Sequence, residues 1–127
     1  MPQSTEGIPM HAKWTFIFLT LILLISCGPS DRYSNGQLKQ RIGTMKDKNG
    51  NTLNHGEFVE WFENGQKSQQ GTYFQGRLEG PFYQWYENGK KRSLRFYENG
   101  DLNGTTTWWD EDGHKTAEKF YKDGIEQ

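Results

Sequence analysis

The sequence WYENGKK at residues 85–91 occurs in three versions in this 127-residue chain. WFENGQK stands at residues 61–67 and WDEDGHK at residues 109–115, each 24 residues from its neighbour. A fixed period of about 20–50 residues is the signature of a repeat architecture. The chain therefore repeats one small structural unit.

The similarity extends beyond this stretch and divides the chain into three units, residues 56–79, 80–103 and 104–127. Glycine, tryptophan, lysine and tyrosine recur at equivalent positions of each unit. Residues 33–55 resemble the same unit with irregular spacing and an extra turn near Lys48–Asn51. Terminal repeats are commonly atypical because they cap the array, so we interpret residues 33–55 as a degenerate N-terminal repeat.

Each unit contains two turn signals. Asn-Gly or Asp-Gly marks the first turn, and Gln-Gly, Asn-Gly or Asp-Gly marks the second. Such dipeptides favour type I′ hairpins, because both central residues need positive φ. Hydrophobic residues make up only 32% of the chain but aromatic residues 15%, a balance that favours strands. We predict an all-β fold, a single antiparallel meander of stacked hairpins with about six to eight strands, and no helix after residue 30.

The N-terminus has the features of an export signal. Residues 14–25 form an apolar run that is shorter than the roughly 20 residues a membrane-spanning helix needs. Leu24-Ile25-Ser26-Cys27 resembles the lipobox of bacterial lipoproteins, in which the cysteine is lipidated and becomes the first residue. The resemblance implies a cleaved signal helix at residues 1–26, an acylated Cys27 that attaches to membrane lipid, and a tether at residues 27–32. A non-cleaved anchor and a buried structural cysteine are the alternatives.

The residue after the lipobox cysteine bears on localisation. In the enterobacterial sorting scheme an aspartate there retains a lipoprotein at the inner membrane, whereas this chain has Gly28. The resemblance therefore implies a lipoprotein of the bacterial cell envelope, anchored at the outer membrane.

The pattern Gly-x-x-x-x-Trp-Tyr-Glu-Asn-Gly-Lys followed by Tyr-x-x-Gly-x-Leu-x-Gly resembles the bacterial variant of the MORN repeat. The resemblance covers residues 56–127 well and residues 33–55 loosely. It implies an elongated sheet that acts in scaffolding and partner binding. Many bacterial proteins with this variant are named as antitoxins of toxin–antitoxin systems, and others are lipoproteins. A toxin or an envelope protein is therefore the partner that the resemblance implies.

Catalysis, metal binding and nucleic-acid binding find little support. The net charge is −1, so no global positive field favours nucleic acid. His55 and His114 stand at variable loop positions, and no nucleophile, base and orienting group occur at a motif spacing. Asp110-Glu111-Asp112-Gly113 lacks the remaining ligands of a calcium loop. We expect a non-enzymatic protein without a metal or another cofactor.

The aromatic residues are the best candidates for a binding site. Alternation places Trp61, Trp85 and Trp109 on one sheet face with Val59, Tyr83 and Thr107, and Phe58 and Phe82 on the other. The tryptophan column and Tyr86 are candidates for contact with a protein partner, and the same column is a candidate core. Trp108 replaces Glu60 and Gln84 of the other units, so it is expected to be exposed and is the strongest single candidate.

A second column contains Lys67, Lys91 and Lys115. These lysines either form a basic stripe that contacts phospholipid head groups, or they prevent the edges of the hairpins from pairing with strands of other chains. We favour edge protection, because glutamates flank the same turns. The sequence predicts a lipid-anchored, protein-binding scaffold, and the family resemblance implies an antitoxin or immunity-type role for it. The alternative is an envelope protein that binds glycan or peptidoglycan on an aromatic face.

Overall fold

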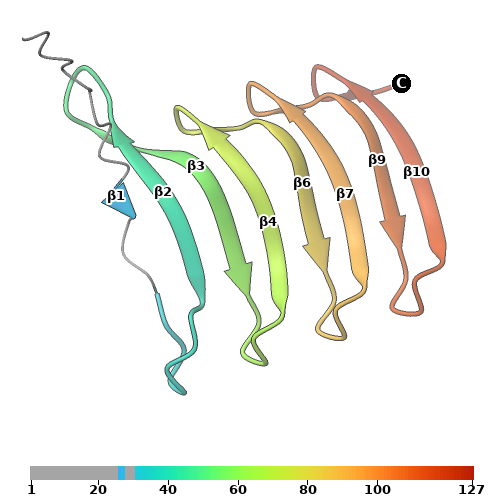
Figure 1. Cartoon of the computed structure of the whole chain (residues 1–127). Helices are drawn as coiled ribbons and strands as arrows, with labels where there is room; N and C mark the ends of the chain where they lie inside the picture. The colour runs from blue at the N-terminus through green and yellow to red at the C-terminus, as the bar shows by residue number, and fades with distance from the viewer. Residues whose placement is uncertain (1–25, 28–30) are drawn as a thin grey trace, which may run out of the picture.

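The computed structural model describes residues 26–27 and 31–127, which form one antiparallel sheet without a helix (Figure 1). Seven strands are long: β2 (Gln40–Lys46), β3 (Thr52–Trp61), β4 (Lys67–Phe74), β6 (Gly80–Trp85), β7 (Lys91–Glu98), β9 (Gly104–Trp109) and β10 (Lys115–Lys122). Four are short: β1 (Ser26–Cys27), β5 (Arg77–Leu78), β8 (Asp101–Leu102) and β11 (Ile125–Glu126).

The long strands follow one another in space in the order of the sequence. Each 24-residue unit supplies one hairpin, and the hairpins β3–β4, β6–β7 and β9–β10 lie side by side (Figure 1). The predicted all-β meander of stacked hairpins is therefore confirmed. Among the described residues, every strand pairing between repeats joins units that are adjacent in sequence.

The upper turns, at the top of Figure 1, are two-residue hairpin turns. Both central residues have positive φ, for example 49° at Gln75 and 86° at Gly76. This geometry is that of the type I′ turn, whose twist matches that of the flanking strands. Asn99-Gly100 and Asp123-Gly124 repeat it, so the prediction is correct for the upper turns.

The lower turns differ from the prediction. In the turn from Phe62 to Gln66 only Gly65 has positive φ, at 83°, and its amide donates to the Phe62 carbonyl at 2.9 Å. The loop is therefore a three-residue hairpin with a glycine bulge. Asn64 keeps ordinary φ because its side-chain oxygen accepts the Gln66 amide at 2.9 Å. Asn-Gly is compatible with either turn, and this side-chain bond favours the longer loop.

Asparagine side chains also join one lower turn to the next. The amide group of Asn64 donates to the Glu87 carbonyl at 2.9 Å, and that of Asn88 donates to the Glu111 carbonyl at 3.0 Å. Asn35 makes the same contact with Glu63 at 3.4 Å. We call this series the asparagine ladder.

The glycine that opens each repeat is required by the backbone conformation at that position. Gly56, Gly80 and Gly104 have φ of 88°, 76° and 115°, a range that residues with a side chain rarely adopt. At these positions the pairing register shifts by two residues, for example between the β4–β5 and β4–β6 pairs. The glycines thus let the chain pass from the short strand of one upper turn into the next long strand.

The two faces of the sheet carry the predicted residues. The face with Phe58 and Phe82 also carries Tyr73, Tyr97 and Tyr121, and we call it the tyrosine face. The face with Trp61, Trp85 and Trp109 is called the tryptophan face; Tyr83 stacks on Trp85 there, and Val59 is 1% exposed.

The most buried aromatic residues lie on the tyrosine face. The rings of Phe58 and Phe82 stack at 6.3 Å, and Tyr73 and Tyr97 contact them edge-on. Phe58 and Phe82 are 9% and 7% exposed. Gly71 lies beneath Phe82, where an added Cβ would stand 2.6 Å from the ring. The small core on this face is therefore built within one layer from aromatic rings.

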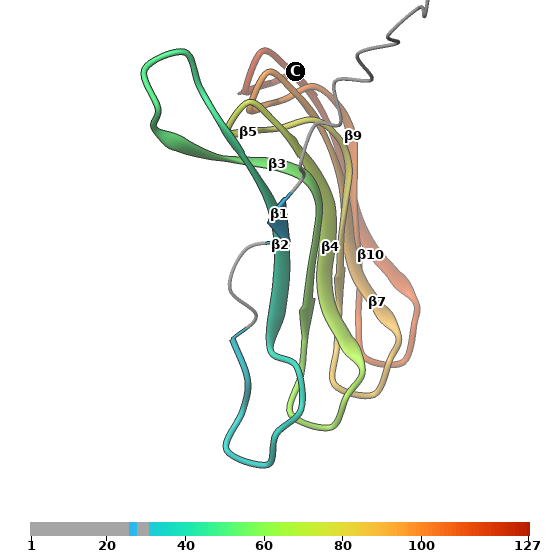
Figure 2. The same ribbon diagram turned by 60° about the vertical axis from the view of Figure 1, so that its left-hand side comes forward.

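The N-terminal unit repeats the lower turn and then departs from the pattern. Residues 33–37 make the same turn bonds as residues 62–66. The hairpin β2–β3 is longer, turns at Asp47–Asn51, and leans away from the repeats at its upper end (Figure 2). Asp31 and Arg32, the last two residues of the predicted tether, bond to the residues that follow this first turn: the Asp31 carbonyl accepts the Lys39 and Gln40 amides, and Arg32 pairs with Leu38.

The predicted signal and most of the tether, residues 1–25 and 28–30, lie outside the described residues. Cys27 belongs to β1, which pairs with Thr44 and Gly43 of β2. Within the part of the chain that the structure describes, no helix is long and apolar enough to cross a membrane.

Candidate binding surfaces

The tryptophan column is half-buried rather than fully buried or fully exposed. Trp61, Trp85 and Trp109 stand at equivalent ends of β3, β6 and β9, opposite lysines of the next strands. The Trp85 ring stacks on Tyr83 with centroids 5.6 Å apart. Each indole thus packs on its own sheet and keeps part of its surface open, so the column contributes both to packing and to the surface.

Trp108 does not occupy the exposed position that the sequence suggests. It is half-buried on the tyrosine face, where it pairs with Ser93 of β7 and Ala117 of β10. Both neighbours are small, and Ser93 is 0% exposed. Small cross-strand partners leave room for a large ring, which explains how an indole fits where Glu60 and Gln84 stand in the other units.

Tyr86 belongs to a column that follows the lower turns of the tyrosine face. Its hydroxyl donates to the Trp109 carbonyl at 2.9 Å, and the hydroxyl of Tyr33 donates to the Trp61 carbonyl at 3.0 Å. Phe62 stands at the equivalent position between them. Tyr33, Phe62 and Tyr86 thus form one aromatic row, with each tyrosine hydroxyl bonded to the next unit.

Two adjoining depressions follow this row, with volumes of about 220 and 400 Å³. Both are lined by Phe62, Trp85 and Arg92, so we treat them as one surface, the lower groove. The remaining lining residues are Tyr33, Glu60, Ser68, Gln69, Gln84, Tyr86, Glu87, Asn88 and Glu111. The groove combines aromatic rings with one arginine and several acceptors.

Arg92 occupies the middle of the lower groove. Its guanidinium carbon lies 5.7 Å from the centre of the Tyr86 ring, a cation–π distance. Arg92 is the unpaired extra residue of a β-bulge, since Ser93 pairs with Gln84 and Lys91 with Trp85. Bulges redirect side chains and often lie beside functional sites.

Sequence reasoning missed Arg92 as a site residue, because the bulge breaks the alternation from which faces are assigned. The equivalent positions, Ser68 and Thr116, hold small polar residues. One arginine in a column of hydroxyl residues was the only available signal.

The lysine column has a different explanation from the one we favoured. Lys67 and Lys91 lie on the interior strands β4 and β7, and only Lys115 lies on the edge strand β10. Edge protection therefore accounts for Lys115 alone. Lys67 donates to Gln70 at 2.9 Å, Lys91 lies 5.7 Å from the centre of the Tyr83 ring, and Lys115 pairs with Glu118.

His55 and Asp110, two titratable residues of the loops, form hydrogen bonds that stabilise turns. The Nδ1 atom of His55 accepts the Gln75 amide at 3.3 Å, and His114 lies 3.5 Å from Asp110. The backbone amide of His114 donates to Asp110 at 2.8 Å and lowers the pKa of that carboxyl. Asp110, which replaces the aromatic residue of the other units, thereby closes the last lower turn. Among residues 26–27 and 31–127 no cluster of three or more potential ligands could hold a metal ion.

The chain was compared with protein families, curated proteins and solved structures. The family described as MORN repeat variant matches residues 54–75, 78–99 and 102–123, with the same period as the units seen here. The comparisons with curated proteins and with solved structures gave no match. The three matched segments cover just over half of the chain and coincide with its three stacked hairpins, so the chain belongs to the MORN repeat variant family.

Proposed function

We propose that this MORN repeat scaffold is a non-enzymatic, lipid-anchored protein of the bacterial envelope that binds a partner protein in the lower groove. The observation that carries the proposal is the convergence of Phe62, Trp85, Tyr86 and Arg92 on one continuous depression. Tryptophan, tyrosine and arginine are the residues most enriched in binding hot spots of protein interfaces. Repeat arrays commonly use the extended surface that their stacked units create.

The groove is also partly organised before a partner binds. The Tyr86 hydroxyl is fixed on the Trp109 carbonyl, and the Arg92 guanidinium lies over the same ring. Side chains that are already ordered lose less conformational entropy on binding. The acceptors around them, including Glu60 and Glu111, favour a partner that presents hydrogen-bond donors or a basic side chain to the groove.

The test is quantitative capture of the partner. The tagged full-length protein is cross-linked in cells, purified and analysed by mass spectrometry. Arg92→Ala is expected to weaken binding of the partner about thirtyfold and to reduce its recovery accordingly, since hot-spot truncations cost about 2 kcal/mol. Arg77→Ala, an exposed arginine of β5 outside the groove, is the matched control. Equal recovery with both variants would remove the groove from the proposal.

The lipid anchor is tested separately at Cys27. Cys27→Ala is expected to release the protein from the membrane fraction, because attachment then lacks its acyl chains. Unchanged fractionation would show that the chain is held in another way. Separation of the inner and outer membranes then shows which membrane holds the protein. Because glycine rather than aspartate follows Cys27, we expect the outer membrane.

An antitoxin or immunity-type role is the specific form of this function that the family resemblance suggests. It requires one partner at a fixed stoichiometry and a toxin encoded nearby. The alternative is binding of glycan or peptidoglycan to the half-buried tryptophans. A shift of tryptophan fluorescence with cell-wall fragments, together with capture of no reproducible protein, would favour the alternative.

A further inference from the structure

All the strongly exposed large apolar residues of the described chain lie on one face. Phe74, Phe96, Phe120 and Ile125 are 55%, 38%, 50% and 67% exposed. Strand register places each on the tryptophan face, because their neighbours Tyr73, Tyr97 and Tyr121 point to the other side. Phe74, Phe96 and Phe120 recur at equivalent positions of β4, β7 and β10, and Ile125 follows on β11, so the exposed side chains form a series along the upper part of this face.

The tyrosine face needs no such cover. Its large rings Phe58 and Phe82 are already buried by each other and by Tyr73 and Tyr97. A sheet with one apolar face is stable when that face packs against a second layer. Within the described residues no second layer covers the tryptophan face (Figures 1 and 2).

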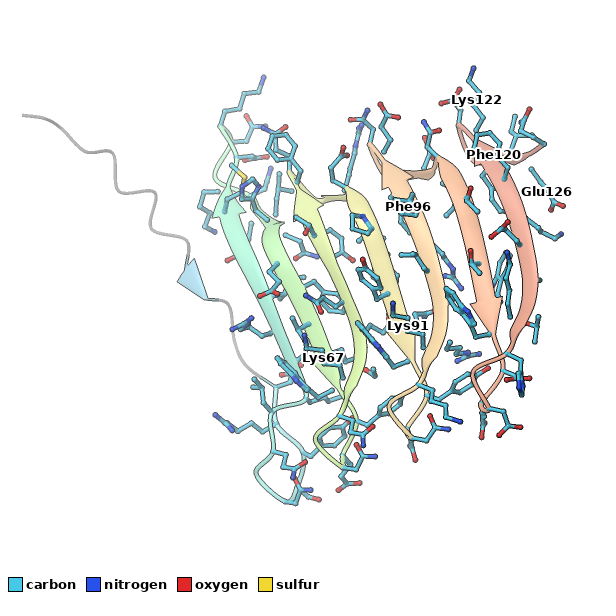
Figure 3. All side chains as sticks on the ribbon, turned by 45° about the vertical axis from the view of Figure 1, so that its right-hand side comes forward. Lys67, Lys91, Phe96, Phe120, Lys122 and Glu126 are labelled. Atoms are coloured by element: carbon cyan, nitrogen blue, oxygen red, sulfur yellow. The ribbon has the colours of Figure 1, made fainter. Side chains whose placement is uncertain are left out.

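Several charged groups of the tryptophan face have partners within it. Lys115 pairs with Glu118 and Arg41 with Glu57, while Lys67 bonds to Gln70. Figure 3 shows Lys67 and Lys91 near the lower ends of their strands, and Phe96 and Phe120 near the upper ends. Lysines that are already paired are poor ligands for a polyanion. A covering surface that is itself largely apolar is therefore favoured.

The size of this face suits a two-protomer interface. Seven long strands of about eight residues, spaced about 4.8 Å apart with a rise of about 3.3 Å, span roughly 29 by 26 Å, or about 750 Å². A standard interface takes about 800 Å² from each partner. One copy of the same sheet therefore has the area needed to cover another copy.

We propose that a second copy of this chain covers the tryptophan face, so that two single-layer sheets form one β-sandwich. Two sheets packed in this way lie about 10 Å apart. The two-fold axis lies midway between the sheets, parallel to both and perpendicular to the strands. It places the lower end of one copy over the upper end of the other. Lys67 and Lys91 then lie opposite the end that carries Glu98 and Asp101, rather than opposite their own copies. The interface is isologous, as in most homodimers.

Of the four groove residues that carry the proposed function, Phe62, Tyr86 and Arg92 lie on the tyrosine face and Trp85 on the tryptophan face. The proposed dimer therefore covers the face opposite Arg92, and this inference does not depend on the partner proposed above. The lower groove stays open in such a dimer. Each dimer would present two grooves, one on each outer surface. Loss of partner capture in Arg92→Ala and loss of the dimer are therefore separate results.

Site-specific photo-cross-linking in the expressing cells tests the dimer. Benzoylphenylalanine replaces Phe96 in the full-length chain, and in a matched variant it replaces Tyr97, the adjacent residue on the tyrosine face. The expected result is a self-cross-linked species of twice the chain mass from position 96 and none from position 97. The linked peptide should come from the tryptophan face of the second copy. Cross-links from position 96 only to other proteins or to lipid would overturn the proposal, as would no cross-link.

A mass measurement gives an independent test. The purified full-length protein should sediment as two chains, and Phe96→Lys with Phe120→Lys should halve that mass. Ser34→Lys with Asn49→Lys adds the same charge in exposed turns and should leave the mass unchanged. Circular dichroism verifies that each variant folds. If the variant with lysine at positions 96 and 120 is unfolded, the photo-cross-linking result at position 96 is the test of the dimer. A wild-type protein that sediments as a single chain would overturn the proposal.

Discussion

The two faces of this sheet use aromatic residues in different ways. On the tyrosine face, Phe58 and Phe82 bury each other at a ring distance of 6.3 Å, over a glycine that leaves room for the second ring. On the tryptophan face, equally large side chains such as Phe96 and Phe120 stay exposed. A single layer can therefore build a core on one side by stacking along the repeats. The other side is left for contact with a further surface.

The largest expected difference between the faces comes from truncating one phenylalanine on each. Phe82→Ala should lower the free energy of unfolding by about 3–5 kcal/mol, because it opens a cavity between Phe58 and Tyr97. Phe96→Ala should cost about 1 kcal/mol or less at concentrations that hold single chains, because its ring is 38% exposed. Denaturant unfolding followed by circular dichroism measures both. Equal costs would contradict the division into a packed and an open face.

Gly71 tests how tightly the packed face is filled. A Cβ at this position would stand 2.6 Å from the Phe82 ring, and over-packing costs about 1–3 kcal/mol. Gly71→Ala should therefore lower the melting temperature, even though alanine has a higher strand propensity than glycine. Thr72→Ala, at the next position on the open face, should change the melting temperature little. A stabilised Gly71→Ala protein would show that the ring moves without cost.

Thr106 offers a change of opposite sign. It stands where the other units have Phe58 and Phe82, is 1% exposed, and its hydroxyl oxygen has no hydrogen-bond partner. Thr106→Val should raise the free energy of unfolding by about 1 kcal/mol, because it removes an unsatisfied buried hydroxyl. Thr107→Val is the control on the other face, where the hydroxyl donates to Glu118 at 3.2 Å. That variant should gain nothing.

The smallest effect is expected at the lower turns. Asn88→Asp keeps the acceptor for the Lys90 amide but loses the donor to the Glu111 carbonyl. The loss should cost about 0.5–1 kcal/mol in thermal unfolding. Asp112→Asn restores the common residue in the last lower turn, beyond which no further lower turn follows among the described residues. It should be close to neutral, and a similar cost for both would mean that the asparagine ladder contributes nothing.

The fold was largely predictable because its information is local and repeated. The period gave the hairpins, and Val59 and Trp61 alternated onto the predicted face. The lower turns were not predictable, since Asn64-Gly65 fits two hairpin types and a side-chain bond selects between them. The upper turn showed the reverse situation, because Gln75 adopts positive φ where the sequence offers no asparagine.

The candidate site was predicted only in part. Tyr86 was identified and does line the lower groove, whereas Arg92 was not, because an extra residue in β7 turns its side chain toward Tyr86. Trp108 was expected to be exposed, but Ser93 and Ala117 leave space for it to lie against the sheet. Both cases depend on cross-strand neighbours, which alternation along one strand does not specify.

Within residues 31–127, the hydrogen bonds between repeat units join units that are adjacent in sequence. Besides the asparagine ladder, the amide of Gly76 donates to Asn54, that of Gly100 to Leu78, and that of Gly124 to Leu102. Stability in such an array approximates a sum of unit and nearest-neighbour terms, and opening begins at the ends. Amide exchange should therefore be slowest in β4, β6 and β7 and progressively faster toward β10. The molecule would then lose its order one hairpin at a time rather than in a single step.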